Sequence, residues 1–161
     1  MRIVRVEAWL VELELRAPYT VAYDTFEVAK NVLLRLHTDG RHVGLGCAAP
    51  DEHVTGETPE EVLASIDEVA APILRGVDPL RSAWIFEKIR RPLAETPSAR
   101  AAIDMACHDL LGKIAGLPLY KLLGGYRDRI VTSVTVGILP ADETVRQAVD
   151  FAEQGFRSIK I

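Results

Sequence analysis

Residues 130–161 decide the fold of this chain; their sequence is IVTSVTVGILPADETVRQAVDFAEQGFRSIKI. The first nine of these residues are rich in β-branched side chains, which is typical of a buried strand. Pro140 ends this strand, residues 141–154 follow with helical spacing, and Gly155 marks the end of the helix. The last six residues begin another strand, so the pattern predicts a β-α-β unit, which requires a parallel sheet.

A parallel sheet is normally covered on both faces, and two strands are too few to achieve this. We therefore expect the 161 residues to be the front part of a larger protein that ends inside the second strand of a barrel or sheet. We also expect such a piece to expose apolar barrel surface. The sequence leaves open why it stops at Ile161.

Lys160 interrupts a mostly apolar strand, and its neighbours Ile159 and Ile161 point to the opposite face. A lysine on the inner face of a sheet or barrel is costly unless it is paired or neutralised. Such lysines often serve as bases, so Lys160 is a candidate catalytic residue. The alternative is a lysine at the solvated end of a strand.

Bulk composition is that of an ordinary globular protein, with 48% hydrophobic and 26% charged residues. The net charge of −4, with acidic and basic residues interspersed, argues against nucleic acid or an anionic membrane as the main partner. No apolar run approaches the roughly 20 residues of a membrane helix, and we expect no signal peptide. Cys47 and Cys107 form neither a disulfide framework nor a zinc-binding spacing. These features predict a cytoplasmic protein.

The N-terminal part predicts an antiparallel sheet. Residues 3–15, 31–38 and 42–48 have strand-like apolar patterns, and Asp39-Gly40 is a strong hairpin turn between the last two. We therefore expect a three-stranded antiparallel meander.

Helices are predicted to follow the meander. Thr58-Pro59-Glu60-Glu61 predicts a helix that starts with a capping box, and Gly76 ends it. Asp78-Pro79 starts a second helix, and Ser98 caps a third over residues 99–115. Alanines in the third helix allow close packing against a neighbour. Meander and helical bundle together make an α+β domain.

The order of elements resembles the enolase superfamily, in its muconate-lactonizing branch. Ala101-Ala102-Ile103-Asp104-Met105-Ala106-Cys107-His108-Asp109-Leu110-Leu111-Gly112-Lys113 and its continuation to Gly124-Gly125 resemble the typical helix of the capping domain and its exit. Thr132-Ser133-Val134-Thr135-Val136-Gly137-Ile138 is similar to the first barrel strand of dipeptide epimerases. Ser158-Ile159-Lys160-Ile161 resembles the start of the Lys-x-Lys motif on the second barrel strand.

This resemblance implies a capping domain at residues 1–125 and the start of a (β/α) TIM-like barrel at residues 126–161. It also implies Mg²⁺ as the cofactor, because the enolate formed by removing a proton next to a carboxylate needs a cation. The counterpart of Lys160 sits beside the catalytic lysine, helps to bind the carboxylate and keeps the pKa of that neighbouring lysine low, because a nearby like charge disfavours the protonated form. The counterpart of Thr135 lines the substrate pocket. The family's metal ligands lie on later strands, so this chain is expected to contain no metal ligand.

In this family, two loops of the capping domain choose the substrate, and here they correspond to residues 16–30 and 49–58. Tyr19, Tyr23 and Val54 lie in these loops. They could form pocket walls, or they could only pack the loops.

Asp24 departs from the pattern of the family's Ala-Glu epimerases, which tend to carry an arginine at this position. An aspartate repels a carboxylate and attracts an amine, so it predicts a preference for a neutral or cationic dipeptide. The alternative is an ordinary aspartate that forms a turn.

Other polar residues have structural interpretations. Gly56-Glu57 predict turn and helix-cap chemistry. Asp104 and His108, four apart on one helix face, predict a local pair. The histidines have no ligand-like spacing and are expected to be structural or solvent-facing: His37, His42, His53 and His108.

The resemblance predicts that the full-length protein is a dipeptide epimerase that inverts an α-carbon through a metal-stabilised enolate. Its partner would be a small-molecule substrate, and we expect a homo-oligomer. The 161 residues alone are expected to be inactive. Alternatives on the same scaffold are a cycloisomerase, an o-succinylbenzoate synthase or an N-acylamino acid racemase. A further alternative is a non-catalytic interaction module.

Overall fold

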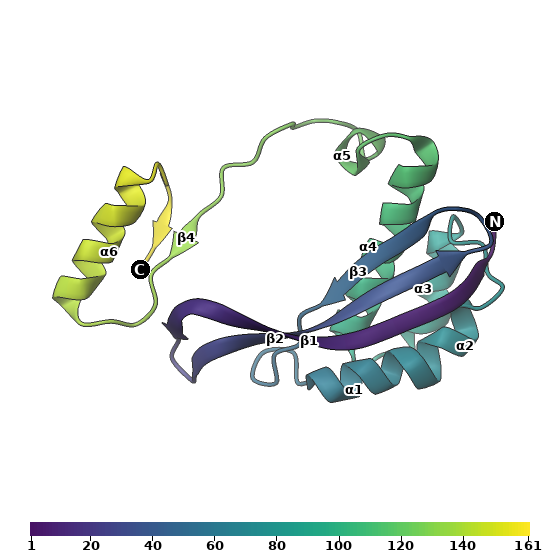
Figure 1. The fold of residues 1–161 in the computed structure, drawn as a ribbon, viewed down its shortest axis with the longest axis horizontal. Helices are drawn as coiled ribbons and strands as arrows, with labels where there is room; N and C mark the ends of the chain where they lie inside the picture. The colour runs from purple at the N-terminus through teal and green to yellow at the C-terminus, as the bar shows by residue number, and fades with distance from the viewer. The chain divides into compact units, whose positions relative to one another are not determined.

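The computed structural model describes residues 1–161, which form two compact units. The first unit comprises residues 1–13 and 30–125, and the second comprises residues 14–29 and 126–161. Figure 1 shows the elements in chain order, and their bounds are β1 Ile3–Thr20, β2 Thr25–Thr38, β3 Val43–Ala48, α1 Pro59–Ala64, η1 Ser65–Ala70, α2 Ala71–Leu74, α3 Ser82–Arg90, α4 Pro97–Ala115, α5 Leu119–Leu122, β4 Val134–Thr135, α6 Ala141–Glu153 and β5 Ile159–Lys160.

The predicted meander and helical bundle are confirmed. Three antiparallel strands lie in the order β1-β2-β3, and the register of the last two pairs Leu34 with Gly46 and Leu36 with Gly44. Leu34 and Leu36 are fully buried, whereas Arg35 between them is exposed. Alternation along β2 therefore directs one face of the sheet into the core.

Helix α4 packs directly on the backbone of β3. A Cβ atom added to Gly46 would overlap the carbonyl oxygen of Ala102, and one added to Gly44 would overlap that of Ala106. Ala102 and Ala106 are themselves fully buried. The predicted close packing of the alanine-rich helix is confirmed, and glycines on both sides of the contact explain it.

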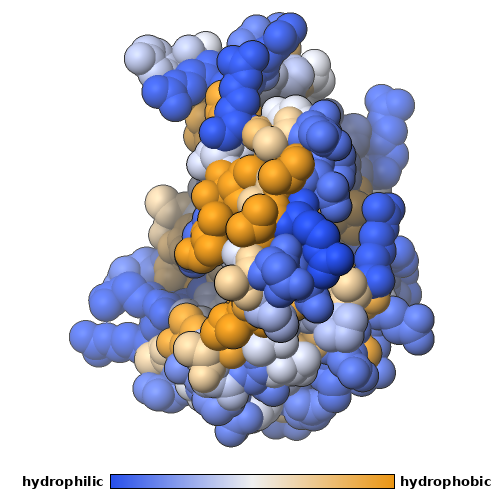
Figure 2. Space-filling view, turned by 90° about the vertical axis from the view of Figure 1, so that its left-hand side faces the viewer, coloured by the Kyte–Doolittle hydropathy of each residue, from blue (hydrophilic) through white to orange (hydrophobic).

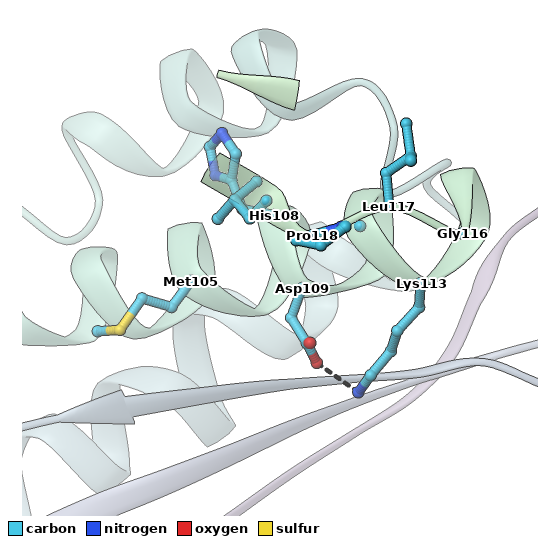
Figure 3. Close-up of a pocket in the computed structure, with 9 residues that line it drawn as sticks. Met105, His108, Asp109, Lys113, Gly116, Leu117 and Pro118 are labelled. Atoms are coloured by element: carbon cyan, nitrogen blue, oxygen red, sulfur yellow. Dashed lines mark hydrogen bonds and ion pairs between the residues drawn. The ribbon is translucent and has the colours of Figure 1, made fainter. Parts of the chain in front are cut away.

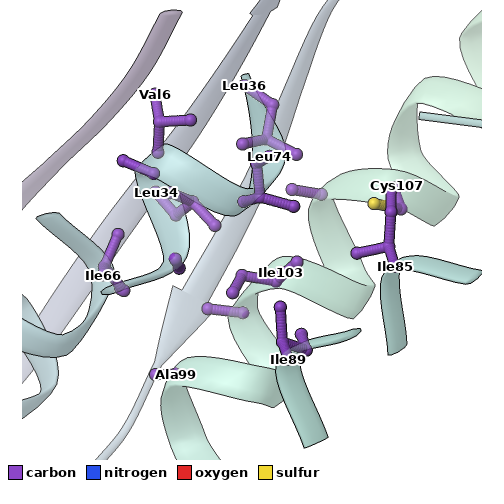
Figure 4. Close-up of a cluster of buried hydrophobic side chains, with 14 of the residues drawn as sticks. Val6, Leu34, Leu36, Ile66, Leu74, Ile85, Ile89, Ala99, Ile103 and Cys107 are labelled. Carbon is purple, nitrogen blue, oxygen red and sulfur yellow. The ribbon is translucent and has the colours of Figure 1, made fainter. Parts of the chain in front are cut away.

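Isoleucine and leucine side chains from the sheet and four helical segments fill the core (Figure 4). Each large aliphatic side chain that is fully buried contributes about 1.5–3 kcal/mol to folding. The largest of them are Ile3, Leu34, Leu36, Ile66, Leu74, Ile85, Ile89, Leu93, Ile103 and Leu110.

The capping box at the start of α1 is confirmed. Thr58 Oγ1 accepts a hydrogen bond from the Glu61 amide at 3.2 Å, and Glu61 Oε2 accepts one from the Thr58 amide at 2.8 Å. The helix is not uniform, however, because η1 is a π-helical segment between α1 and α2. Pro72 has no N–H and cannot donate an α-helical hydrogen bond. Just before it, the Ala71 amide donates to the carbonyl of Ile66, five residues back, which is the π-helical pattern.

Two predicted helix starts were wrong. Helix α3 begins at Ser82, because Asp78 forms a turn in which its side chain accepts from the Leu80 amide at 3.1 Å. Helix α4 begins at Pro97, so Ser98 lies inside its first turn and does not cap it.

The predicted irregular loop at residues 16–30 was also wrong. Strand β1 continues to Thr20 and β2 starts at Thr25, so residues 14–29 are mostly a β-hairpin. The Val21 amide donates to the Asp24 carbonyl at 2.9 Å and closes a turn around Ala22 and Tyr23. Hairpin turns are usually recognised by glycine or asparagine, and this turn has neither.

The predicted β-α-β unit is present in the second unit. Strands β4 and β5 pair in parallel, and Phe151 of α6 packs edge-on against Phe156 at a centroid distance of 5.8 Å. The ladder is shorter than predicted, because β4 comprises Val134–Thr135 alone and residues 130–133 lie outside it.

The spacing of residues 141–154 puts Val145, Ala148, Val149 and Ala152 on one side of α6, but the structure does not bury these four together. Ala148 and Phe151 are half-buried, whereas Val145 and Val149 are 62% and 50% exposed. Ile161 is also exposed. Figure 2 shows apolar surface gathered next to hydrophilic surface on one face of the molecule. The expectation of exposed apolar surface in this part of the chain therefore agrees with the structure.

Replacing Gly46 with alanine is expected to lower the free energy of unfolding by about 2 kcal/mol, because α4 must move away from β3. Urea denaturation of the 161-residue chain measures this change. Gly40→Ala is the matched control, since a Cβ there would meet only Thr38 Oγ1 at 3.6 Å and Met1 Sδ at 3.8 Å. Equal stability of the two variants would contradict the close contact.

The two cysteines are expected to differ in reactivity. Burial raises the pKa of the Cys107 thiol to about 12, so only about one thiol in ten thousand is ionised at pH 8. Cys47 is half-buried. A thiol-specific reagent at pH 8 should label Cys47 and leave Cys107 unmodified, as read by peptide mass spectrometry. Both should be labelled in denaturant, and rapid native labelling of Cys107 would contradict its burial.

Candidate active-site elements

Thr135 and Lys160 are brought together in the second unit. They are directly paired across the β4–β5 ladder, and the Val136 amide donates to the Lys160 carbonyl at 2.9 Å. Paired residues of neighbouring parallel strands project to the same face of a sheet. The hydroxyl of Thr135 and the ammonium of Lys160 therefore lie side by side at the carboxyl ends of the two strands.

Lys160 is exposed rather than buried against apolar side chains. The sheet that carries it has two strands, and β5 has a partner on one side only. The ammonium group is thus accessible to an anionic ligand at this end of the sheet. Its catalytic role stays a prediction.

The hairpin tip lies against the chain that follows β4. The Ile138 amide donates to the Thr20 carbonyl at 2.9 Å, and both residues belong to the second unit. Thr20 Oγ1 and Thr25 Oγ1 are 3.0 Å apart and share a hydrogen bond across the hairpin. The tip is therefore a hydrogen-bonded piece of structure that is attached to the strand bearing Thr135.

Asp24 occupies the end of this tip and is exposed. Its Oδ1 accepts a hydrogen bond from the Thr25 amide at 2.7 Å, which is a turn-forming contact. Its exposed position leaves the carboxylate accessible to a cationic group. Asp24 therefore does form a turn, as one of the two alternatives predicted. This contact uses Oδ1, and a carboxylate has further acceptor sites.

The tyrosines and the valine of the two predicted specificity loops differ in their surroundings. Tyr23 is 47% exposed and packs edge-on against Phe26 at a centroid distance of 6.3 Å, within the hairpin. Tyr19 is half-buried, with its Cδ2 next to Gly137. Val54 is 69% exposed. A role for these three residues in the substrate pocket stays a prediction.

Val54 belongs to a turn that is closed by Asp51. The Asp51 carbonyl accepts hydrogen bonds from the amides of Val54 and Thr55 at 3.0 and 2.6 Å. Thr55 Oγ1 accepts from the Asp51 amide at 3.1 Å, and Asp51 Oδ1 accepts from the His53 amide at 3.0 Å. The turn therefore holds the Val54 side chain outwards on a defined backbone.

Glu57, at the end of the same loop, has the predicted helix-capping role, but at a different helix from the adjacent one. Gly56 does form a turn, with φ of 74°, and Glu57 does cap a helix, but the helix is α4 rather than the adjacent α1. The Glu57 side chain is buried, and its two oxygens accept from the Ser98 amide at 3.0 and 3.2 Å. An acidic residue next to a positive-φ glycine offers no signal for a partner 41 residues away.

A charged cluster on the exposed face of the sheet surrounds Glu7. His37 Nε2 lies 2.6 Å from Glu7 Oε2, and Arg5 Nη1 lies 2.6 Å from Glu7 Oε1. The hydrogen bond from His37 is the main cause that lowers the pKa of Glu7 below its ordinary value.

His108 Nδ1 lies 2.6 Å from Asp104 Oδ1, so the predicted local pair is confirmed. These polar contacts lie within the first unit and involve no predicted site residue.

A groove of about 530 Å³ lies at the C-terminal end of α4 (Figure 3). Asp109 and Lys113 line it, but both also bind the outer edge of β3. The Leu45 amide donates to Asp109 and Lys113 Nζ donates to the Val43 carbonyl, each at 2.8 Å. These two side chains satisfy the free edge of the sheet, and the groove contains none of the predicted site residues.

The residues present do not form a magnesium site. No group of three or more histidine, cysteine, aspartate or glutamate side chains is arranged to hold a metal ion. Carboxylate oxygens are the ligands that Mg²⁺ prefers, and the paired residues Thr135 and Lys160 carry none. No helix has both the length and the apolar character needed to cross a bilayer.

Comparison with known proteins decides the family. Residues 4–124 match the family model described as "Mandelate racemase / muconate lactonizing enzyme, N-terminal domain". The chain belongs to the mandelate racemase/muconate lactonizing enzyme family. This family membership confirms the resemblance to the enolase superfamily drawn from the sequence.

Several relatives with similar sequences are epimerases. The chain is 42% identical over its full length to the L-Lys-D/L-Arg epimerase of Desulforapulum autotrophicum, of which it covers 46%. It superposes on a dipeptide epimerase of Enterococcus faecalis, complexed with Mg and L-Leu-L-Tyr, with a TM-score of 0.95 and 35% identity, covering all of this chain and 46% of that one. A dipeptide epimerase of Methylococcus capsulatus, complexed with Mg and L-Arg-D-Lys, gives a TM-score of 0.93 and 36% identity over 99% of this chain and 45% of that one. The chain thus spans about half the length of the relatives it matches.

Glu57→Ala is expected to lower the free energy of unfolding of the 161-residue chain by about 2 kcal/mol, because the Ser98 amide loses a charged acceptor in a buried place. Hydrogen exchange at Ser98 should accelerate in the same variant. Glu52→Ala, an exposed acid of the same loop, is the control and should change neither quantity. Unchanged Ser98 protection in Glu57→Ala would contradict the capping contact.

Proposed function

We propose that the complete protein is a dipeptide epimerase that favours substrates with a cationic side chain. The observation that carries the epimerase assignment is the direct pairing of Thr135 with Lys160 at the carboxyl ends of two parallel strands. The similarity to dipeptide epimerases along the whole chain supports it.

Lys160 binds the substrate carboxylate in this proposal. An ammonium group beside the carboxylate favours removal of the neighbouring α-proton, because it offsets the negative charge that develops there. The Thr135 hydroxyl lies on the same face and orients the substrate by donating or accepting a hydrogen bond. The two side chains hold the reacting end of the dipeptide, and the groups that move the proton lie outside these 161 residues.

Magnesium is proposed as a cofactor of the complete protein only. The Mg²⁺ of the related structures offers positive charge to a bound carboxylate, but this chain has no ligand set for it. We therefore place the metal ligands outside the 161 residues and assign no step of the reaction through the metal to this chain. A homo-oligomeric assembly and a cytoplasmic location also stay predictions.

The Asp24 carboxylate is proposed to attract the cationic side chain of the substrate. It is exposed at the hairpin tip and carries the charge opposite to that of Lys160. Two of the relatives described above point the same way, since one is an L-Lys-D/L-Arg epimerase and another was solved with L-Arg-D-Lys. A dipeptide with a basic side chain offers a carboxylate for Lys160 and an ammonium or guanidinium group for Asp24.

The test is the rate of α-proton exchange of L-Ala-L-Lys and L-Ala-L-Glu in D₂O, catalysed by the complete gene product with Mg²⁺ and followed by NMR. We expect kcat/KM to be higher for L-Ala-L-Lys. Asp24→Arg should reduce this preference roughly tenfold or more, which corresponds to about 1.4 kcal/mol. Glu95→Arg makes the same charge change at an exposed site of the first unit and should leave the preference unaltered.

A wild-type preference for L-Ala-L-Glu would overturn the cationic assignment. Absence of exchange with every dipeptide tested would overturn the epimerase assignment itself.

A further inference from the structure

Two consecutive residues after β4 make contact with the hairpin tip, and both contacts lie within the second unit. The first is the hydrogen bond of 2.9 Å from the Ile138 amide to the Thr20 carbonyl. It joins backbone to backbone, so it does not depend on which side chains the two residues carry. The second contact is made by Gly137, which has no side chain.

Gly137 is closely approached by the hairpin. A Cβ at this position would lie 3.1 Å from Thr20 O, 3.3 Å from Thr20 N and 3.4 Å from Tyr19 Cδ2. Two of these three atoms belong to the backbone and have no rotamer by which to move aside. Carbon normally stays farther than this from backbone oxygen, so a Cβ at position 137 requires the hairpin backbone to shift by a few tenths of an ångström.

The backbone of Gly137 does not itself require glycine. Its φ is outside the left-handed region, unlike that of six other glycines in the chain. An L-residue could adopt this conformation without strain. The absence of a side chain at position 137 therefore serves the neighbouring hairpin and not a local turn.

Gly137 stands between the residues proposed to bind the two ends of the substrate. Thr135 is paired with Lys160, and the Val136 amide bonds to the Lys160 carbonyl. On the other side, Thr20 lies four residues before Asp24 in a tip closed by the Val21–Asp24 bond. A shift of Thr20 is therefore transmitted to Asp24, while the Thr135–Lys160 pair stays with its own ladder.

We propose that Gly137 is a positioning residue for substrate specificity: its missing side chain sets the distance between the Asp24 carboxylate and the Thr135–Lys160 pair. This inference rests on the proposed function and deepens it. The residue does not touch the substrate, and its effect is exerted through the hairpin tip. The adjacent residue, Val136, has a different role, because its buried side chain contributes to the packing of the second unit.

The kinetic test is a double-mutant cycle in the complete protein with Gly137→Ala and Asp24→Asn. We expect Gly137→Ala to raise KM for L-Ala-L-Lys about fivefold to tenfold while changing KM for L-Ala-L-Ala less than twofold. In the Asp24→Asn background the additional effect on L-Ala-L-Lys should disappear, because the group that was displaced no longer carries charge. Gly40→Ala, where a Cβ has room, is the control.

A purely structural role for Gly137 predicts another result. Gly137→Ala would then lower kcat/KM equally for the cationic and the neutral dipeptide, with the same effect in the Asp24→Asn background. An equal loss for the two dipeptides would overturn the proposal, and so would an undiminished effect in the Asp24→Asn background.

Hydrogen exchange of the 161-residue chain tests the structural half of the proposal without any activity. The Ile138 amide should be protected in the wild type and should exchange at least tenfold faster in Gly137→Ala.

Ile138→Pro removes the same N–H without adding a side chain at position 137, and in the complete protein it should raise KM for the cationic dipeptide in the same way. If the wild type epimerises no dipeptide but Gly137→Ala releases the Ile138 amide, the proposed function fails and the positioning of the hairpin stands. Unchanged exchange at Ile138 would overturn the positioning itself.

Discussion

The close approach of α4 to β3 is the contact on which the first unit depends. It is possible because Gly44 and Gly46 have no side chains where Ala102 and Ala106 have small ones. The helix axis is thereby brought against the backbone of an edge strand, and long side chains farther along the helix come within reach of that edge. Asp109 and Lys113 satisfy the outward amide of Leu45 and carbonyl of Val43, groups that an open sheet edge would leave to water or to another strand.

The same helix supports the loop at residues 49–58, the second of the two predicted specificity loops. Its first turn presents the Ser98 amide to the buried carboxylate of Glu57. The negative carboxylate of Glu57 and the positive partial charge at the N-terminus of α4 attract each other. The loop that carries Val54 is consequently held from within by the Asp51 turn and at its end by α4. The packing of small residues in the core thus decides where a surface loop stands.

In the second unit, the hairpin tip and the two parallel strands form one body. The tip is an extension of strands that begin in the first unit, yet its residues 14–29 group with residues 126–161. Backbone hydrogen bonding explains this grouping, since the Thr20 carbonyl receives the Ile138 amide just beyond β4. An exposed acid at the tip and an exposed lysine on the ladder therefore lie on one structural unit.

The sequence by itself determined the elements whose hydrogen bonds are local. Apolar alternation and the Asp39-Gly40 turn predict the meander, Thr58 and Glu61 predict the capping box, and residues 130–161 predict the β-α-β unit, because each pattern is local in the sequence. Only the tertiary structure decided that residues 16–30 are a hairpin, that Glu57 caps α4, and that the hairpin backbone closely approaches Gly137. The partners in the last two cases lie 41 and more than 100 residues away, and no local pattern encodes which distant backbone atom will occupy a given space. Local propensity selects the elements, whereas the steric fit between distant backbones decides where the side chains proposed to bind substrate are held.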